Sequence, residues 1–142
     1  RFNRRLSFLR ELCTRAESVN VALASGAHPE VVRLAVERAV HVAAECVTDI
    51  GSDLLDWFIM RDAASYEDIV DILQGEGLFS EGLYAWLREL ALMRKPLVQQ
   101  YDTVDADKLA SLTADMPVRL PEFAEAVAKF ADKEMEIFRA KP

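Results

Sequence analysis

PEVVRLAVERAVHVAAECVTDIGSDLLDWFI, residues 29–59, is the most apolar stretch of the chain and decides its fold. Apolar residues recur there at spacings of three and four, which predicts a helix, and they cover more than one stripe of its surface. Pro29 suits the first turn of a helix, where its missing N–H costs little. Because a helix that is apolar on several sides has to be covered on several sides, we expect it to be the central helix of a bundle or part of a subunit interface.

Four further helical segments are predicted on either side of this helix. They cover residues 3–24, 65–73, 80–93 and 106–138. Ser65 and Ser80 are good N-caps for the second and third of them, whereas Pro117 and Pro121 are expected to interrupt the last. The sequence shows no strand-like alternation and no internal repeat. We therefore predict an all-α fold, a single domain over residues 1–142 built as an up-and-down bundle of about five helices.

The composition is that of a globular protein without a membrane span. Apolar residues make up 51% of the chain, with only five glycines and five prolines, which excludes a disordered or fibrous protein. No run of about 18 apolar residues occurs, and no signal-peptide segment follows the basic residues 1–5. Cys13 and Cys46 lack metal-binding spacing, so reduced thiols of a cytoplasmic protein are favoured over a redox role. We expect no cofactor.

The net charge of −7 is unevenly distributed along the chain. Residues 1–41 carry a balance of +3, and residues 42–142 carry a balance of −10. Because an acidic protein does not attract nucleic acid through its overall field, any contact with RNA needs a local basic patch. The favoured interpretation of the N-terminal arginines is nevertheless a solvated helix face. The candidate patch comprises Arg1, Arg4, Arg5 and Arg10, with Arg94 and Lys95 as an extension.

The sequence MRKPLVQQY, residues 93–101, contains the side chains best suited to bind a ligand or take part in a reaction. Arg94 is a permanent cation that can bind a phosphate through two hydrogen bonds, and Tyr101 offers a phenol that can accept a modifying group. Seven residues separate them, close to two helical turns, so we expect them to share one helix face. Pro96 predicts a kink or a helix end between them. In the alternative interpretation Arg94 forms a surface ion pair, Gln99 is exposed and Tyr101 caps the bundle.

This stretch resembles the R-x-x-x-x-H-x-Y motif of the HEPN family, in its HepT-like branch. Residues 38–55 are similar to the E-x-x-x-D-I-G-N-H-L segment of that branch, and residues 65–73 to S-Y-x-D-x-F-x-x-L, in the same order. The resemblance implies a homodimeric bundle in which the motifs of two protomers face a shared cleft. It also implies a toxin–antitoxin system. In such a system the toxin is a metal-independent RNase using the motif arginine and histidine, and a minimal nucleotidyltransferase neutralises it by transferring AMP to the motif tyrosine.

Arg94 and Tyr101 match this motif, but Gln99 stands where the family has histidine. Glutamine does not titrate, and proton transfer by a positioned group contributes about 10²–10⁴-fold, so we expect the RNase activity to be weakened or lost. The chain would remain a toxin–antitoxin protein with Arg94 and Gln99 at the cleft, Tyr101 as AMP acceptor and RNA as a candidate ligand. The alternative is a non-catalytic dimeric interaction or nucleotide-binding module that assists a nucleotidyltransferase. A plain helical scaffold is the third interpretation.

Asp49 is the other polar residue of interest, because it lies within the most apolar helix. It is either a cleft carboxylate near Arg94 or a carboxylate at the helix edge that is hydrogen-bonded locally or to water. Glu45 lies one turn earlier on the same face, so both carboxylates could line one groove. A divalent metal there is the less favoured interpretation, because neither histidine has metal-binding spacing and no further ligands are evident.

Overall fold

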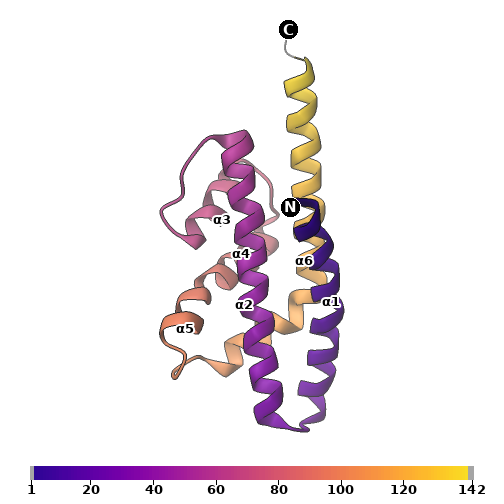
Figure 1. The fold of residues 1–142 in the computed structure, drawn as a ribbon, viewed down its shortest axis with the longest axis vertical. Helices are drawn as coiled ribbons and strands as arrows, with labels where there is room; N and C mark the ends of the chain where they lie inside the picture. The colour runs from indigo at the N-terminus through magenta and orange to yellow at the C-terminus, as the bar shows by residue number, and fades with distance from the viewer. Residues whose placement is uncertain (1, 141–142) are drawn as a thin grey trace.

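Helix α2 (Pro29–Leu54) runs through the middle of the molecule, as its apolar surface predicts (Figure 1). On one side of it lie α1 (Phe2–Ser25) and α6 (Ala106–Ala140), and on the other lie α3 (Tyr66–Gly75) and α4 (Glu81–Leu92). The computed structural model describes residues 2–140, and it contains no strand in that range. The predicted all-α bundle is confirmed.

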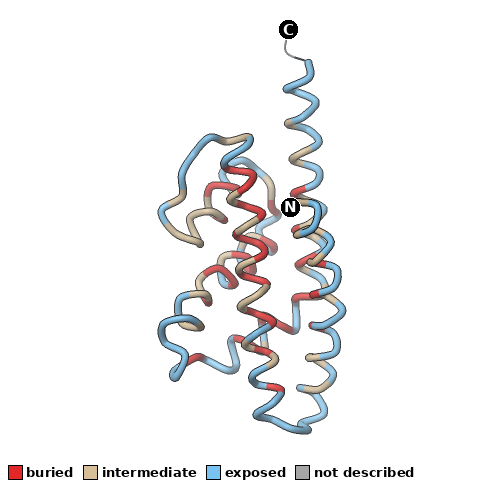
Figure 2. The backbone as a smooth tube through the Cα atoms, in the orientation of Figure 1, coloured by how far each residue is buried: buried red, intermediate tan, exposed pale blue. Residues whose placement is uncertain are grey.

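Burial is greatest along α2, which is the helix most enclosed by others (Figure 2). Val40, Ala43, Ile50 and Leu54 expose none of their surface. Gly51 allows α3 to approach closely, because a Cβ atom at this position would lie 2.6 Å from Cγ2 of Ile69. Close packing of this kind fixes how α3 sits against α2, and α3 carries one wall of the site described below.

Both ends of the predicted 29–59 helix are set by residues with positive φ. Gly26, with a φ of 71°, and His28, with a φ of 49°, reverse the chain between α1 and α2. At the far end α2 passes into a π turn, η1 (Leu55–Ile59). Met60 stops it with a φ of 58°, and its N–H donates to the carbonyl of Leu55 at 2.6 Å.

The predicted caps of the two short helices are confirmed. The Ser65 hydroxyl accepts a hydrogen bond from the N–H of Asp68, and the Ser80 hydroxyl accepts one from the N–H of Leu83. Each satisfies an N–H that the first turn of a helix leaves without a partner. The caps therefore fix where α3 and α4 begin, and so where Tyr66, the first residue of α3, is placed.

The predicted break near Pro96 separates α4 from the short helix α5 (Arg94–Gln99). Proline has no N–H to donate to the carbonyl of Leu92, so the helix is interrupted at Met93. α5 then ends at Gln99, and Gln100 leaves helical geometry with a φ of −128° and a ψ of 41°. The expectation that Arg94 and Tyr101 share a face of one helix was therefore wrong, because Tyr101 lies beyond the helix end.

Helix α6 continues through both prolines that were expected to interrupt it. Figure 1 shows it bending in its first half before it runs alongside α1. Pro117 has no N–H for the carbonyl of Thr113, four residues earlier, and Asn20 Nδ2 of α1 donates to that carbonyl instead at 2.9 Å. The prolines therefore produce a bend that α1 stabilises, and the helix itself does not end.

Candidate functional site

Arg94 lies at the centre of the polar site formed by α2, α3 and α5. Its Nε donates a hydrogen bond to Oε1 of Glu45 at 2.7 Å. The guanidinium carbon lies 4.1 Å from the ring centroid of Tyr66, in cation–π contact. The Arg94 side chain is 30% exposed and that of Glu45 is 34% exposed, so the pair is at the surface and accessible to a ligand.

The break at Pro96 is what gives Arg94 this position. Arg94 is the first residue of α5, directly after the interruption, and three elements meet at its side chain. Glu45 occupies only the Nε edge of the guanidinium. Among residues 2–140, no acceptor is hydrogen-bonded to its two Nη groups. These two groups form the planar fork that binds a phosphate through two hydrogen bonds.

His41 contacts the same carboxylate. Its Nε2 is 3.5 Å from Oε1 of Glu45, the oxygen that also contacts Arg94, and its side chain is 31% exposed. The spacing of four residues places His41 and Glu45 on adjacent turns of α2. An imidazole and a guanidinium thus contact one carboxylate oxygen at the surface.

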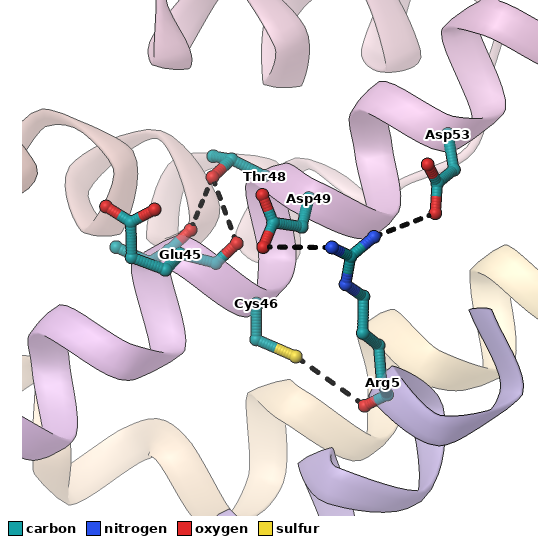
Figure 3. A network of polar contacts seen from close by, with 7 residues as sticks. Arg5, Glu45, Cys46, Thr48, Asp49 and Asp53 are labelled. Atoms are coloured by element: carbon teal, nitrogen blue, oxygen red, sulfur yellow. Dashed lines mark hydrogen bonds and ion pairs between the residues drawn. The ribbon is translucent and has the colours of Figure 1, made fainter. Parts of the chain in front are cut away.

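Asp49 belongs to a neighbouring polar cluster, shown in Figure 3. Arg5 of α1 donates from Nη1 to Oδ2 of the buried Asp53 at 3.1 Å, and its Nη2 lies 3.6 Å from Oδ2 of Asp49. Glu45 points away from this cluster in Figure 3. The carboxylate that holds Arg94 is therefore Glu45, whereas Asp49 forms an ion pair with Arg5.

These contacts also change the interpretation of the arginine patch. Arg5 is partly buried and paired with two carboxylates, and Arg94 is paired with Glu45, so neither is a freely solvated cation. Arg1 lies outside the described residues. Arg4 and Arg10 are exposed on α1, in agreement with the solvated helix face that the sequence favoured.

Cys46 packs beside Arg5, and its Sγ contacts the Arg5 carbonyl at 3.5 Å. Burial, together with the nearby charge of Asp49, raises the pKa of the Cys46 thiol to about 11, although Arg5 opposes the shift. Burial and the charge of Glu17 also raise the pKa of Cys13. Both cysteines are free thiols, and both are poor nucleophiles at neutral pH.

A pocket of about 480 Å³ continues the site along α2 towards η1. Its walls include Asp49, Ser52 and Asp56 of α2 and η1, with Arg61 and Tyr66 opposite. Tyr66 therefore has Arg94 against its ring and also lines this pocket. Among residues 2–140, no three His, Cys, Asp or Glu side chains are grouped so that they could hold a metal ion.

Gln99 and Tyr101 lie at the edge of the site. Gln99, at the last position of α5, is exposed. Tyr101 follows the helix in a turn, and 72% of its surface is exposed. The predicted residues are thus only partly brought together, since no contact joins Arg94 to either of these two within the described part of the chain.

Sequence reasoning missed Tyr66 and the role of Glu45 at Arg94. The signal for His41 was present, because His41 and Glu45 stand four residues apart in a helix. The signal for Tyr66 was its place directly after the N-cap Ser65, at the start of a short helix. Neither pattern shows that α5 meets these residues in space.

Comparison with known proteins identifies the family. The family model described as "Ribonuclease HepT-like" matches residues 9–129, which is most of the chain. This chain belongs to the HepT-like ribonuclease family. The HepT-like match includes all the residues of the site, from His41 to Tyr101.

One relative of this HepT-like chain is a Bacillus subtilis (strain 168) protein named "Putative RNase YutE". The two are 38% identical over 106 residues, which cover 75% of this chain and 74% of the relative. The solved structure of YutE, described as a cytosolic protein of unknown function, superposes with a TM-score of 0.79 at 32% identity. That match covers 94% of this chain and 90% of YutE.

A second solved structure shares the HepT-like fold at much lower identity. It is described as a toxin–antitoxin with AMP-PNP, and its TM-score is 0.73 at 13% identity, covering 92% of this chain and 97% of that one. At this identity the likeness shows the fold alone. Within residues 2–140 of this chain, no helix has the length and apolar character needed to cross a membrane.

Proposed function

We propose that this HepT-like protein is the RNA-binding toxin component of a toxin–antitoxin pair. Arg94 binds an RNA phosphate, and Tyr101 accepts AMP from a partner minimal nucleotidyltransferase. The observation that carries the proposal is the placement of Arg94. Its guanidinium is fixed by Glu45 and Tyr66 while both Nη groups remain available to an anion.

Phosphate binding at Arg94 follows from the geometry of its partners. Glu45 contacts Nε and Tyr66 covers the flat face, so the side chain loses little further freedom when it binds a ligand. Charge-assisted hydrogen bonds between a guanidinium and a phosphate are among the stronger polar contacts of proteins. Because the protein as a whole is acidic, binding depends on this local cation rather than on the overall field.

Position 99 limits the chemistry of this site. A glutamine there donates and accepts hydrogen bonds but transfers no proton near neutral pH. Its exposure allows it to contact RNA without acting as an acid or a base. We therefore expect RNA cleavage to be weaker than in a site with histidine at this position.

Tyr101 suits the role of AMP acceptor because it is accessible. The side chain stands in a turn outside α5, and a partner can reach its hydroxyl without unfolding a helix. In the transfer, the Tyr101 oxygen bonds to the α-phosphorus of ATP, pyrophosphate leaves, and the phenolic proton passes to solvent. The added phosphate places a negative charge at the edge of the site, where it would repel the RNA backbone.

The proposed partners include a second copy of this chain. Large apolar side chains remain exposed on α2 and where η1 lies beside the C-terminal part of α6, which is typical of surfaces that associate. A hollow of about 430 Å³ at the second of these places is bordered by Trp57 and Phe58 and by Met135 and Phe138 of α6. The most exposed large apolar residues of α2 are Val31 and Leu34.

RNA binding tests this proposal directly. Wild type and Arg94→Gln are titrated into a fluorescently labelled single-stranded RNA at several salt concentrations. We expect Arg94→Gln to weaken binding about tenfold or more, because a hydrogen bond to a charged group contributes about 1.5–3 kcal/mol. It should also make the dependence of the RNA association constant on salt less steep. The slope of the logarithm of that constant against the logarithm of the salt concentration should shrink in magnitude by about 0.7, the value for one phosphate of a single strand.

The matched control is Arg88→Gln. Arg88 of α4 is paired with Asp71 of α3 at 3.3 Å, so its removal deletes the same charge without touching the contacts of Arg94 with Glu45 and Tyr66. This variant should bind RNA as wild type does. Equal binding by wild type and Arg94→Gln would contradict the proposal.

The non-catalytic alternative has one observation in its favour. The pocket of about 480 Å³ beside Tyr66 is large enough for part of a nucleotide, and it has hydroxyl, carboxylate and guanidinium groups on its walls. A module that binds a nucleotide there without cleaving RNA would be protected against thermal unfolding by ATP alone. The RNA-binding function predicts no such protection.

A further inference from the structure

The chain has two histidines, and histidine is the side chain that most readily transfers protons near neutral pH. His28 is exposed in the turn before α2, about 25 Å from Glu45 along the helix axis at 1.5 Å per residue. His41 lies one turn from Glu45 and shares with Arg94 the contact to Oε1 of that residue. Only one of the two histidines is therefore next to the phosphate-binding arginine.

The contact with Glu45 prepares His41 for proton transfer. A carboxylate 3.5 Å from Nε2 favours the tautomer that carries its proton on Nε2, and it leaves the lone pair on Nδ1. Because the His41 side chain is 31% exposed, a ligand held by Arg94 can reach it.

We propose that His41 is the catalytic base of this cleft and replaces the motif histidine that Gln99 lacks. The inference rests on the proposed binding of RNA phosphate at Arg94. In this arrangement Arg94 holds the phosphate and Glu45 is a positioning residue that orients both the imidazole and the guanidinium.

The reaction is an internal transfer within the RNA. Nδ1 of His41 removes the proton of a 2′-hydroxyl, and the 2′-oxygen forms a bond to the adjacent phosphorus. The bond from phosphorus to the 5′-oxygen of the next nucleotide breaks, and that oxygen takes a proton from water. The products are one RNA with a 2′,3′-cyclic phosphate and another with a 5′-hydroxyl, and His41 returns its proton to solvent.

The test measures cleavage of a labelled single-stranded RNA by the full chain in the presence of EDTA. Wild type should produce fragments with 2′,3′-cyclic phosphate ends, identified by mass spectrometry. His41→Asn should lower the cleavage rate constant about a hundredfold or more, while RNA affinity and the thermal midpoint stay near those of wild type. His28→Asn, which suits the positive φ of that turn, should cleave at the wild-type rate.

Two results would overturn the role of His41. One is a wild-type protein that binds RNA but does not cleave it, and the other is His41→Asn cleaving as fast as wild type. His41→Gln serves as the second variant if His41→Asn does not fold. A failure of the proposed function is distinct, because it appears as RNA binding that does not depend on Arg94, whatever the cleavage rate.

Discussion

Arg94 and Glu45 are 49 residues apart in the chain, and Nε of one lies 2.7 Å from Oε1 of the other. This contact brings the break between α4 and α5 against the central helix. It also means that a phosphate entering the site meets a carboxylate already bound to the arginine. Glu45 therefore opposes ligand binding at Arg94 while it orients the side chains around it.

Substituting Glu45→Gln separates these two effects. RNA should bind more tightly because a competing negative charge is lost, whereas cleavage should slow because His41 loses the carboxylate at Nε2. Fluorescence anisotropy measures the first and product formation on a gel measures the second. Stability should change by no more than about 1 kcal/mol, since the ion pair is partly exposed.

The matched control for this substitution is Glu89→Gln. It removes the same charge from the surface pair with Lys108, whose atoms are 2.8 Å apart. Both the RNA affinity and the cleavage rate of this variant should equal those of wild type. Weaker RNA binding by Glu45→Gln would show that the carboxylate does not compete with the ligand.

Tyr66 should contribute to RNA binding through its ring. Tyr66→Leu removes the surface on which the Arg94 guanidinium stacks, 4.1 Å from the ring centroid. A cation–π contact at a surface contributes about 0.5–1 kcal/mol, so RNA affinity should fall roughly two- to fivefold. Tyr66→Phe keeps the ring and should bind as wild type does. An equal loss in both variants would instead implicate the hydroxyl.

The contribution of Asn20 to the free energy of unfolding should depend on proline at position 117. Asn20→Ala removes the donor to the Thr113 carbonyl and should lower the free energy of unfolding by about 1–2 kcal/mol. In a Pro117→Ala background the new backbone N–H can bond that carbonyl, so the same substitution should have a smaller effect. Urea unfolding of all four variants gives the coupling energy. Independent, additive effects would contradict this origin of the bend in α6.

Cys46 should be the slower of the two thiols to react. A raised pKa means that the thiol stays neutral below that value, and the reactive thiolate of Cys46 forms in the folded protein only as the pH approaches about 11. At pH 8, iodoacetamide should modify Cys13 before Cys46, because Cys13 is less buried. Peptide mass spectrometry follows each site, and Cys13→Ser and Cys46→Ser assign them. Faster labelling of Cys46 in folded protein would contradict the buried environment.

The sequence was sufficient to predict the helical bundle because its signals are local. The apolar pattern of residues 29–59 predicts a covered central helix, and Ser65 and Ser80 mark two helix starts that the structure confirms. The prolines of α6 were harder to interpret. Whether Pro117 ends a helix or bends it depends on a donor from α1, and such a donor is not visible from the residues around the proline.

The site was predicted less completely than the fold. Arg94 stands out in the sequence, but the carboxylate beside it depends on how α5 turns after Met93, which the periodicity of α2 does not determine. Asp49 and Glu45 are equivalent candidates in the sequence, and only the packing of α1, which brings Arg5 to Asp49, distinguishes them. The end of α5 at Gln99 similarly removes Tyr101 from the face of Arg94.

The central claim is that this protein is the toxin component of a pair whose partner modifies Tyr101. The most direct measurement is the intact mass of the purified chain after incubation with ATP and a minimal nucleotidyltransferase of the proposed antitoxin type. We predict an increase by one or more AMP groups in wild type and in Tyr84→Phe, whose hydroxyl is bonded to Asp71 at 2.6 Å. Tyr101→Phe should gain none. An unchanged wild-type mass, or AMP addition that persists in Tyr101→Phe, would contradict the account.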